Sequence, residues 1–196
     1  MYRSLMTMAL LIGLALGVSA QVATPAEHPA GTQVATPAAH NGPKIEWLSW
    51  EQAVAKMEKQ PRKIMVDVYT DWCGWCKRMD ATTMEDPKII KIINEKYYAV
   101  KMDGEGKKDI TFRGRTYKFI AQGHRGYHEL PAELLSGKMS YPTLVFLDED
   151  YGIIQPLPGY QDVPTLEPIL AYFGGGFYKT TPWENFQNDF KAGKVN

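Results

Sequence analysis

The residues most able to do chemistry in this chain are Cys73 and Cys76, the only two cysteines among 196 residues. Thiols separated by two residues can close a reversible disulfide or contribute to a metal site. The short, β-branched run from Ile64 to Tyr69 predicts a buried strand before the pair, and the residues after it, through Ala81, favour a helix. The two thiols are therefore expected where a strand leads into a helix N-terminus.

That position predicts that Cys73 is the reactive thiol. Unpaired backbone N–H groups and the positive end of a helix dipole stabilise a thiolate, which is the nucleophilic form. Cys76, one turn further, could then resolve a mixed disulfide at Cys73, so the expected reaction is thiol–disulfide exchange. Trp72 and Trp75 flank the two sulfur atoms and would form an apolar contact surface; core packing is the alternative, especially for Trp72.

Residues Trp72-Cys73-Gly74-Trp75-Cys76-Lys77, with Asp67 six positions before the first cysteine, resemble the active site of the thioredoxin superfamily. The other mark of that superfamily is a cis-proline facing the disulfide, and Pro142 in Ser140-Tyr141-Pro142-Thr143 matches it. The resemblance covers about residues 44–173 and departs at Trp75, where thioredoxin itself has proline. It implies an α/β fold with a central mixed β-sheet flanked by helices.

The resemblance also implies roles for individual residues. Asp67 would lie buried beneath the cysteines and relay the proton of Cys76; the alternative is a satisfied structural carboxylate, although a buried aspartate without a task or partner is costly. A cis Pro142 would present the backbone of Tyr141 to an incoming peptide as an added strand. No cofactor is expected beyond the cysteine pair. The residues expected to contact substrate are Trp72, Gly74, Trp75, Tyr141 and Pro142.

Composition indicates one globular domain whose net charge would not attract a highly charged partner. Hydrophobic residues make up 44% of the chain and charged residues 22%, which is ordinary for a chain that can bury a core. The 22 basic residues balance the 22 acidic ones, so nothing favours nucleic acid as a partner. The chain is expected to be a monomer.

Residues 1–20 are predicted to be a secretory signal peptide. Arg3 precedes an apolar run from Leu5 to Val18, and small residues follow to Ala20. The run is shorter than the ~20 residues that a membrane-spanning helix needs. We therefore expect a soluble, exported chain in the periplasm or another extracytoplasmic compartment. Its expected partners are disulfide-containing exported proteins and a membrane protein that donates electrons.

The rest of the chain divides by composition. Residues 21–43 are rich in Ala, Pro and Thr, have few bulky apolar side chains and are predicted to be a disordered linker. Residues 44–196 would form the thioredoxin-like domain, with an insertion at 104–139 before the cis-proline strand. Basic and aromatic residues cluster in this insertion, which could be a surface elaboration or a partner-recognition loop beside the active site. Within it, Glu129 to Leu135 predicts a short helix closed by Gly137.

Capping signals predict where two early helices begin. Ser49 and Gln52 form a capping box, and Asp86-Pro87 offers an N-cap followed by proline at the first helical position. The first of these helices would bury one face, which carries Trp50, Ala53, Val54 and Met57.

Two further helices are expected near the C-terminus. One would begin at about Thr165, which places Pro168 in its first turn, where proline is tolerated. Residues 174–196 would be a C-terminal extension, with a last helix that opens on a capping box of Thr181 and Glu184.

Reductase, oxidase and isomerase share this cysteine motif, and we favour the reductase. Strong oxidants owe their low cysteine pKa to groups that stabilise the thiolate, whereas the dipeptide Gly74-Trp75 is neutral. A buried, ionised Asp67 would raise the pKa of the cysteines and favour the disulfide, which makes the dithiol a better reductant. The oxidase and the isomerase remain the alternatives.

Two readings from other classes compete with redox catalysis. One is a non-catalytic, partner-binding thioredoxin-like domain, against which the two intact cysteines argue. The other is a zinc-binding module, although the separation between its cysteine pair and its histidine pair far exceeds finger spacing. The four zinc ligands would be Cys73, Cys76, His124 and His128.

Overall fold

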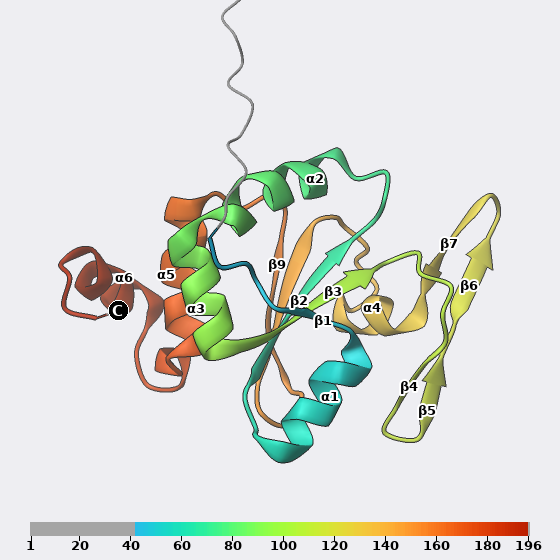
Figure 1. Cartoon of the computed structure of the whole chain (residues 1–196), viewed down its shortest axis with the longest axis horizontal. Helices are drawn as coiled ribbons and strands as arrows, with labels where there is room; N and C mark the ends of the chain where they lie inside the picture. The colour runs from blue at the N-terminus through green and yellow to red at the C-terminus, as the bar shows by residue number, and fades with distance from the viewer. Residues whose placement is uncertain (1–41, 196) are drawn as a thin grey trace, which may run out of the picture. The chain divides into compact units, whose positions relative to one another are not determined.

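The computed structural model describes residues 42–195. The predicted signal peptide, 1–20, and the predicted linker up to residue 41 lie outside the described residues. The described part is a central mixed sheet with helices on both of its faces, as predicted (Figure 1). None of the helices in residues 42–195 combines the length and apolar character needed to cross a membrane.

The central sheet has five strands in the order β1-β3-β2-β8-β9 (Figure 1). They are β1 (Trp47–Leu48), β2 (Lys63–Tyr69), β3 (Tyr97–Asp103), β8 (Thr143–Leu147) and β9 (Ile153–Pro158). β3 runs parallel to β1 and β2, whereas β8 runs antiparallel to β2 and forms a hairpin with β9. β9 is one edge of the sheet, and its Pro156 and Pro158 have no backbone N–H.

Helices cover the sheet because alternate side chains of its central strand point to opposite faces. Ile64, Val66 and Val68 of β2 pack with α1 and α4, whereas Met65 packs with α2, α3 and α5. The helices are α1 (Trp50–Lys59), α2 (Gly74–Ala81), α3 (Pro87–Lys96), α4 (Glu129–Leu134), α5 (Val163–Gly174) and α6 (Trp183–Lys191). Short 3₁₀ turns, η1 (Thr83–Glu85) and η2 (Phe177–Lys179), precede α3 and α6.

The predicted capping signals of α1 and α3 are confirmed. Ser49 Oγ accepts the backbone N–H of Gln52 at 3.2 Å, and Gln52 Oε1 accepts that of Ser49 at 2.8 Å. Asp86 caps α3 by accepting two backbone N–H groups, with Pro87 at the first helical position. On α1, Trp50, Ala53 and Met57 are buried, whereas Val54 is only partly buried.

Ser49→Ala is expected to lower the free energy of unfolding by about 1 kcal/mol, because it leaves the Gln52 N–H without its acceptor. Urea denaturation followed by circular dichroism measures the change. Gln52→Glu is the matched variant, since it preserves the capping box and should keep wild-type stability. An unchanged urea midpoint in Ser49→Ala would show that the capping box does not stabilise α1.

Residues 104–139 contain two hairpins that the sequence analysis did not predict. β4 (Ile110–Phe112) pairs with β5 (Arg115–Tyr117), and β6 (Phe119–Gln122) pairs with β7 (Arg125–His128). The first turn is Arg113-Gly114, both with positive φ, as a two-residue hairpin loop requires. α4 then follows directly, so the predicted short helix is confirmed, and Gly137 beyond it has a φ of +75°.

The prediction for the start of α5 was wrong. Asp162 is the N-cap, and its carboxylate accepts the backbone N–H of Thr165 at 3.0 Å. The helix therefore begins at Val163 with Pro164 in its first turn, and Pro168 lies inside the helix. Because Pro168 has no N–H, the carbonyl of Pro164 loses its usual helical partner.

The predicted capping box at the start of α6 was also wrong. Pro182 occupies the N-cap position and makes no side-chain capping bond. Thr181 stays outside the helix because its N–H donates to the Phe177 carbonyl at 2.8 Å and its own carbonyl accepts the Tyr172 hydroxyl at 2.7 Å. α6 is held by its apolar face instead: Phe186 is only 1% exposed and packs against Tyr172 of α5.

Candidate active site

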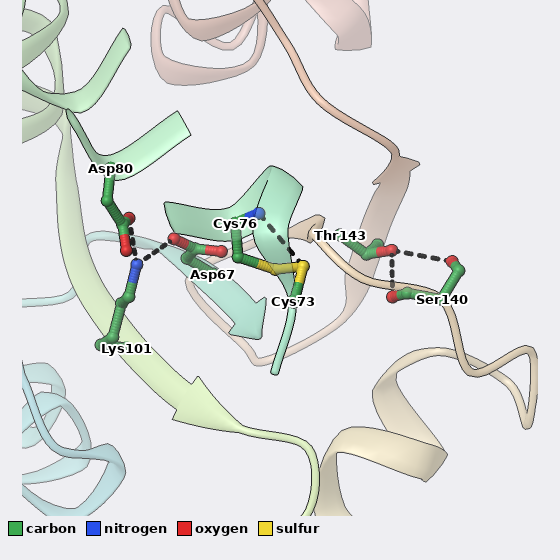
Figure 2. Close-up of a disulfide and its surroundings, with 7 residues drawn as sticks. All are labelled: Asp67, Cys73, Cys76, Asp80, Lys101, Ser140 and Thr143. Carbon is green, nitrogen blue, oxygen red and sulfur yellow. Dashed lines mark hydrogen bonds and ion pairs between the residues drawn. A yellow bond between two sulfur atoms is a disulfide. The ribbon is translucent and has the colours of Figure 1, made fainter. Parts of the chain in front are cut away.

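Cys73 and Cys76 form a disulfide at the start of α2 (Figure 2). The predicted junction of strand and helix is confirmed: β2 ends at Tyr69, and the N–H of Cys73 donates to the Thr70 carbonyl at 3.0 Å. Cys73 is the N-cap residue, and its Sγ accepts the N–H of Cys76 at 3.1 Å. That N–H would stabilise negative charge on the Cys73 sulfur when the disulfide is reduced.

Asp67 lies fully buried on β2, in the middle of the sheet. The strand register places it opposite Lys101 of β3, and Lys101 Nζ is 2.7 Å from its Oδ2. In Figure 2 the carboxylate lies between Lys101 and Cys76, with one oxygen toward each. Its Oδ1 has no hydrogen-bond partner among the residues that the structure describes. Asp67 is therefore paired on one side and unsatisfied on the side of the cysteines.

Lys101 joins Asp67 to a second carboxylate, that of Asp80, and neither Lys101 nor Asp80 was among the predicted site residues. Lys101 Nζ also forms an ion pair with Asp80 of α2 (Figure 2). The ammonium lies 5.1 Å from the ring centroids of both Trp47 and Tyr69. The position of Lys101 within the apolar run of β3 could have indicated this cluster. A charged side chain on a strand that helices cover needs a partner of opposite charge.

These contacts set the proton affinities at the site. Burial raises the pKa of Asp67, and the Lys101 charge offsets this only in part. Burial alone would lower the pKa of Lys101, but the Asp67 and Asp80 carboxylates outweigh it and the pKa is raised. Lys101 thus stays charged, while Asp67 can bind a proton closer to neutral pH than an ordinary aspartate can.

The Tyr141–Pro142 peptide bond is cis, as the resemblance implied. Thr143 Oγ1 donates to the Ser140 carbonyl at 2.8 Å, and the Pro142 carbonyl accepts the N–H of Gly159 at 2.8 Å. Figure 2 shows Ser140 and Thr143 on the opposite side of the disulfide from Lys101. The cysteines therefore lie between the ion-pair cluster of the buried Asp67 with Lys101 and Asp80, and the cis-proline loop.

Trp72 and Trp75 are exposed rather than part of the core. Their exposed fractions are 52% and 56%, so the core-packing alternative for Trp72 was wrong. The ring of Trp72 packs edge to face against that of Tyr141, with the ring centroids 5.8 Å apart. Burial, together with the charges of Glu105 and Asp103, raises the pKa of Tyr141 to about 12. The two exposed indole rings therefore offer apolar surface at the residues that precede Cys73 and Cys76 in the chain.

Gly74 and Tyr141, which were predicted to contact substrate, differ in their surroundings. Gly74 is exposed, and a Cβ there would meet no other atom within 4 Å. Tyr141 is half-buried and packs so closely over Gly104 that a Cβ at Gly104 would overlap its ring. Glycine at position 104 therefore allows Tyr141 to lie beside Trp72.

A stacked arginine lies beside each exposed tryptophan. Arg125 of β7 is 4.6 Å from the centroid of Trp72, and Arg78 of α2 is 5.2 Å from that of Trp75. The insertion therefore reaches the surroundings of the disulfide through Arg125. The basic and aromatic composition of 104–139 was visible in the sequence, but which residue would contact the site was not.

The structure does not bring the four alternative zinc ligands together. Cys73 and Cys76 are joined by the disulfide, and within residues 42–195 no group of three or more His, Cys, Asp or Glu side chains could hold a metal ion. His128 is buried, where its Nε2 is 3.0 Å from the Lys108 carbonyl and its Nδ1 accepts the N–H of Leu130. His124 is exposed.

A family model named Thioredox_DsbH, described as a protein of unknown function, DUF255, matches residues 35–151. The chain belongs to this family. Proteins with curated names match this chain over shorter stretches. An uncharacterized protein of Caenorhabditis elegans is 27% identical over 89 residues, which is 45% of this chain. Spermatogenesis-associated protein 20 of Rattus norvegicus is 29% identical over 73 residues, which is 37% of this chain. The chain spans only 12% and 9% of the length of these two proteins.

Two solved structures show that this Thioredox_DsbH member has the thioredoxin fold. A thioredoxin from Thermus thermophilus is 18% identical, with a TM-score of 0.51 over 69% of this chain and 93% of that one. A thioredoxin-fold protein from Helicobacter pylori is also 18% identical, with a TM-score of 0.52 over 74% of this chain and 84% of that one. The predicted α/β fold class is thereby confirmed, and the match to the Thioredox_DsbH family model bears out the thioredoxin-superfamily resemblance.

Proposed function

We propose that this chain is a thiol–disulfide oxidoreductase that reduces disulfides of exported proteins. The observation that carries the proposal is the Cys73–Cys76 disulfide at a helix N-terminus above a buried, incompletely paired Asp67. A structural disulfide would need no proton acceptor beneath it. A dithiol that must lose a proton in each cycle does need one.

The reaction follows from the positions of these groups. The Cys73 thiolate attacks one sulfur of a substrate disulfide, forms a mixed disulfide and releases the other substrate sulfur as a thiolate. Cys76 gives its proton to Asp67 and attacks Cys73 Sγ, which releases the second substrate thiolate and forms Cys73–Cys76. Two electrons pass from the protein to the substrate, and an external dithiol protein must return them. We assign that role to a membrane electron donor.

Substrate would approach over the exposed face that surrounds the disulfide. The backbone at Tyr141, next to the cis-proline, can pair with an extended peptide. Trp72, Gly74 and Trp75 would contact the residues beside the substrate cysteine. The partners that we propose are disulfide-containing exported proteins bound by a monomer in an extracytoplasmic compartment.

The reductive direction rests on the charges beneath the disulfide. An ionised Asp67 disfavours a second negative charge on the reduced cysteines and so stabilises the disulfide relative to the dithiol. The cation nearest to Asp67, Lys101, is shared with Asp80 and cannot serve the thiolate alone. A protein whose disulfide form is favoured is a reductant.

A redox titration of the purified protein against glutathione tests this direction. We expect a potential nearer to the ~ −270 mV of thioredoxin than to the ~ −120 mV of a strong periplasmic oxidant. Intrinsic tryptophan fluorescence can report the oxidised fraction, because Trp72 and Trp75 flank the disulfide. A potential above about −180 mV, the region of the isomerases, would contradict the reductase assignment but leave thiol–disulfide exchange intact.

A further inference from the structure

The two ends of the exposed surface around the disulfide differ in charge. Beside Trp72 and Tyr141, the carboxylates of Asp103 and Glu105 lie close enough to raise the pKa of Tyr141, and Asp71 in turn acts on Asp103. Arg125 is the cation stacked at this end. Beside Trp75, the side chains that follow Cys76 along α2 are basic and exposed, namely Lys77 and Arg78.

Arg78 is held in place by aromatic rings and not by a carboxylate. Its guanidinium carbon lies 5.2 Å from the ring centroid of Trp75 and 5.6 Å from that of Tyr160. Tyr160 is itself fixed, with its hydroxyl 3.2 Å from Thr82 Oγ1 and its ring 5.6 Å from that of Trp75. We call these three residues, Trp75, Arg78 and Tyr160, the Arg78 clamp.

The charge of the Arg78 clamp is not neutralised within residues 42–195. Neither Arg78 nor Lys77 takes part in any of the ion pairs of the described residues. An arginine stacked on aromatic rings keeps its planar N–H groups free at the edge and has lost part of its rotamer freedom. Both features favour two-point binding of a carboxylate.

We propose that the Arg78 clamp binds a carboxylate beside the reacting cysteine of the substrate, so that acidic peptide disulfides are the preferred substrate class. This inference rests on the proposed function, because it names the substrates of the same cysteine pair. Beside Trp72 the three carboxylates of Asp71, Asp103 and Glu105 outnumber the one cation, Arg125, and would disfavour such a side chain there, so the two ends together orient the peptide across the disulfide.

A pair of peptide disulfides tests the proposal in single turnover. The peptides are identical apart from Glu or Gln beside the cysteine, and each is mixed in excess with the fully reduced protein. Each turnover converts the protein dithiol to the disulfide and the peptide disulfide to two thiols, so no further reductant is involved. The second-order rate constant is followed by tryptophan fluorescence.

We expect the wild-type protein to reduce the Glu peptide about three- to ten-fold faster than the Gln peptide, the range that a partly exposed charge-assisted contact gives. Arg78→Gln should bring this rate ratio down by the same factor, and Arg78→Lys should give an intermediate ratio because it keeps the charge but not the planar fork. The comparison between variants removes the effect of glutamate on the peptide's own reactivity.

Arg113→Gln is the matched control. Arg113 is also exposed and stacked, 4.8 Å from the ring centroid of Tyr151, but it lies at the tip of the β4–β5 hairpin, far from α2 (Figure 1). Its removal should leave the rate ratio unchanged. Equal rate ratios in the wild type and in Arg78→Gln would overturn the proposal while leaving the reductase function standing. Failure of the wild-type protein to reduce either peptide would contradict the proposed function, and this inference with it.

Discussion

Replacing Cys73 with serine is expected to abolish disulfide reduction, with the rate falling to that of the uncatalysed reaction. Cys73 is the N-cap of α2, where the N–H of Cys76 reaches its sulfur, so this is the thiol whose anion the structure can stabilise. A serine hydroxyl is far too weakly acidic to replace it. Reduction of an insulin disulfide, followed by the turbidity of the released chain, measures the loss.

Cys76→Ser separates the two steps of the same reaction. The attacking thiol remains but the resolving thiol is gone, so mixed disulfides with substrate proteins should accumulate and be visible by non-reducing electrophoresis. Cys73→Ser should trap none. If neither variant traps a partner, or if both trap the same amount, then exchange through Cys73 is not the reaction of this site.

Asp67→Asn is expected to slow turnover about 100-fold, toward the lower end of the range for removal of a general base. The amide keeps the shape of the buried carboxylate and can still accept a hydrogen bond from Lys101, but it cannot take the proton of Cys76. The wild-type rate should fall as pH drops through the raised pKa of Asp67, and the variant should lack this acidic limb. Asp80→Asn leaves Asp67 in place and should have a much smaller effect.

The Asp67→Asn substitution should also make the protein more stable at neutral pH. Because burial raises the pKa of Asp67 above its ordinary value of 3.8, the folded protein holds a proton that the unfolded chain releases. The free energy of unfolding therefore falls as the pH rises from 3.8 through the raised pKa of Asp67. Above that raised pKa, the free energy of unfolding stays at the lower value. Asparagine removes this loss, and Lys101 keeps Asp80 as a partner.

Thermal unfolding at two pH values measures this difference. The Asp67→Asn variant should unfold at a higher temperature than the wild type at pH 7, and the two should agree at a pH below 3.8. A gain of ~1 kcal/mol corresponds to about 2–4 °C in a chain of this size. Lower stability of the variant at neutral pH would mean that the ionised carboxylate is fully compensated by Lys101, which would argue against a role in proton transfer.

Local signals predicted much of the framework, because each depends on neighbouring residues. The capping box at Ser49 and the N-cap at Asp86 were correct for this reason. The capping box at Thr181 failed because Phe177 and Tyr172, which precede the capping-box segment, form hydrogen bonds with the Thr181 backbone. The start of α5 was missed although its signal is local: Asp162 caps the helix three residues before Thr165, so Pro168 lies in the helix interior.

Some residues of the candidate site could be predicted from the sequence, whereas others could not. Asp67, Cys73 and Cys76 could be found because they form a motif with fixed spacing, and Pro142 because the short segment Ser140-Tyr141-Pro142-Thr143 resembles the cis-proline loop of the superfamily. Lys101 and Asp80 could not be assigned, because their contact with Asp67 depends on strand register and on how α2 packs over the sheet. Arg125 reaches Trp72 from a hairpin whose path depends on tertiary packing, which no local pattern encodes.

The prolines of β9 have a consequence for behaviour at high concentration. An edge strand with a full row of free N–H and C=O groups is a template on which another chain can extend the sheet, the first step of aggregation. Pro156 and Pro158 take two donors away from β9, and they sit opposite Val145 and Thr143 of β8, along the length of the edge. At the other edge of the sheet, β1 has only two residues that could pair with an added strand. Neither border of the sheet is therefore suited to growth, which protects a chain with exposed tryptophans from self-assembly.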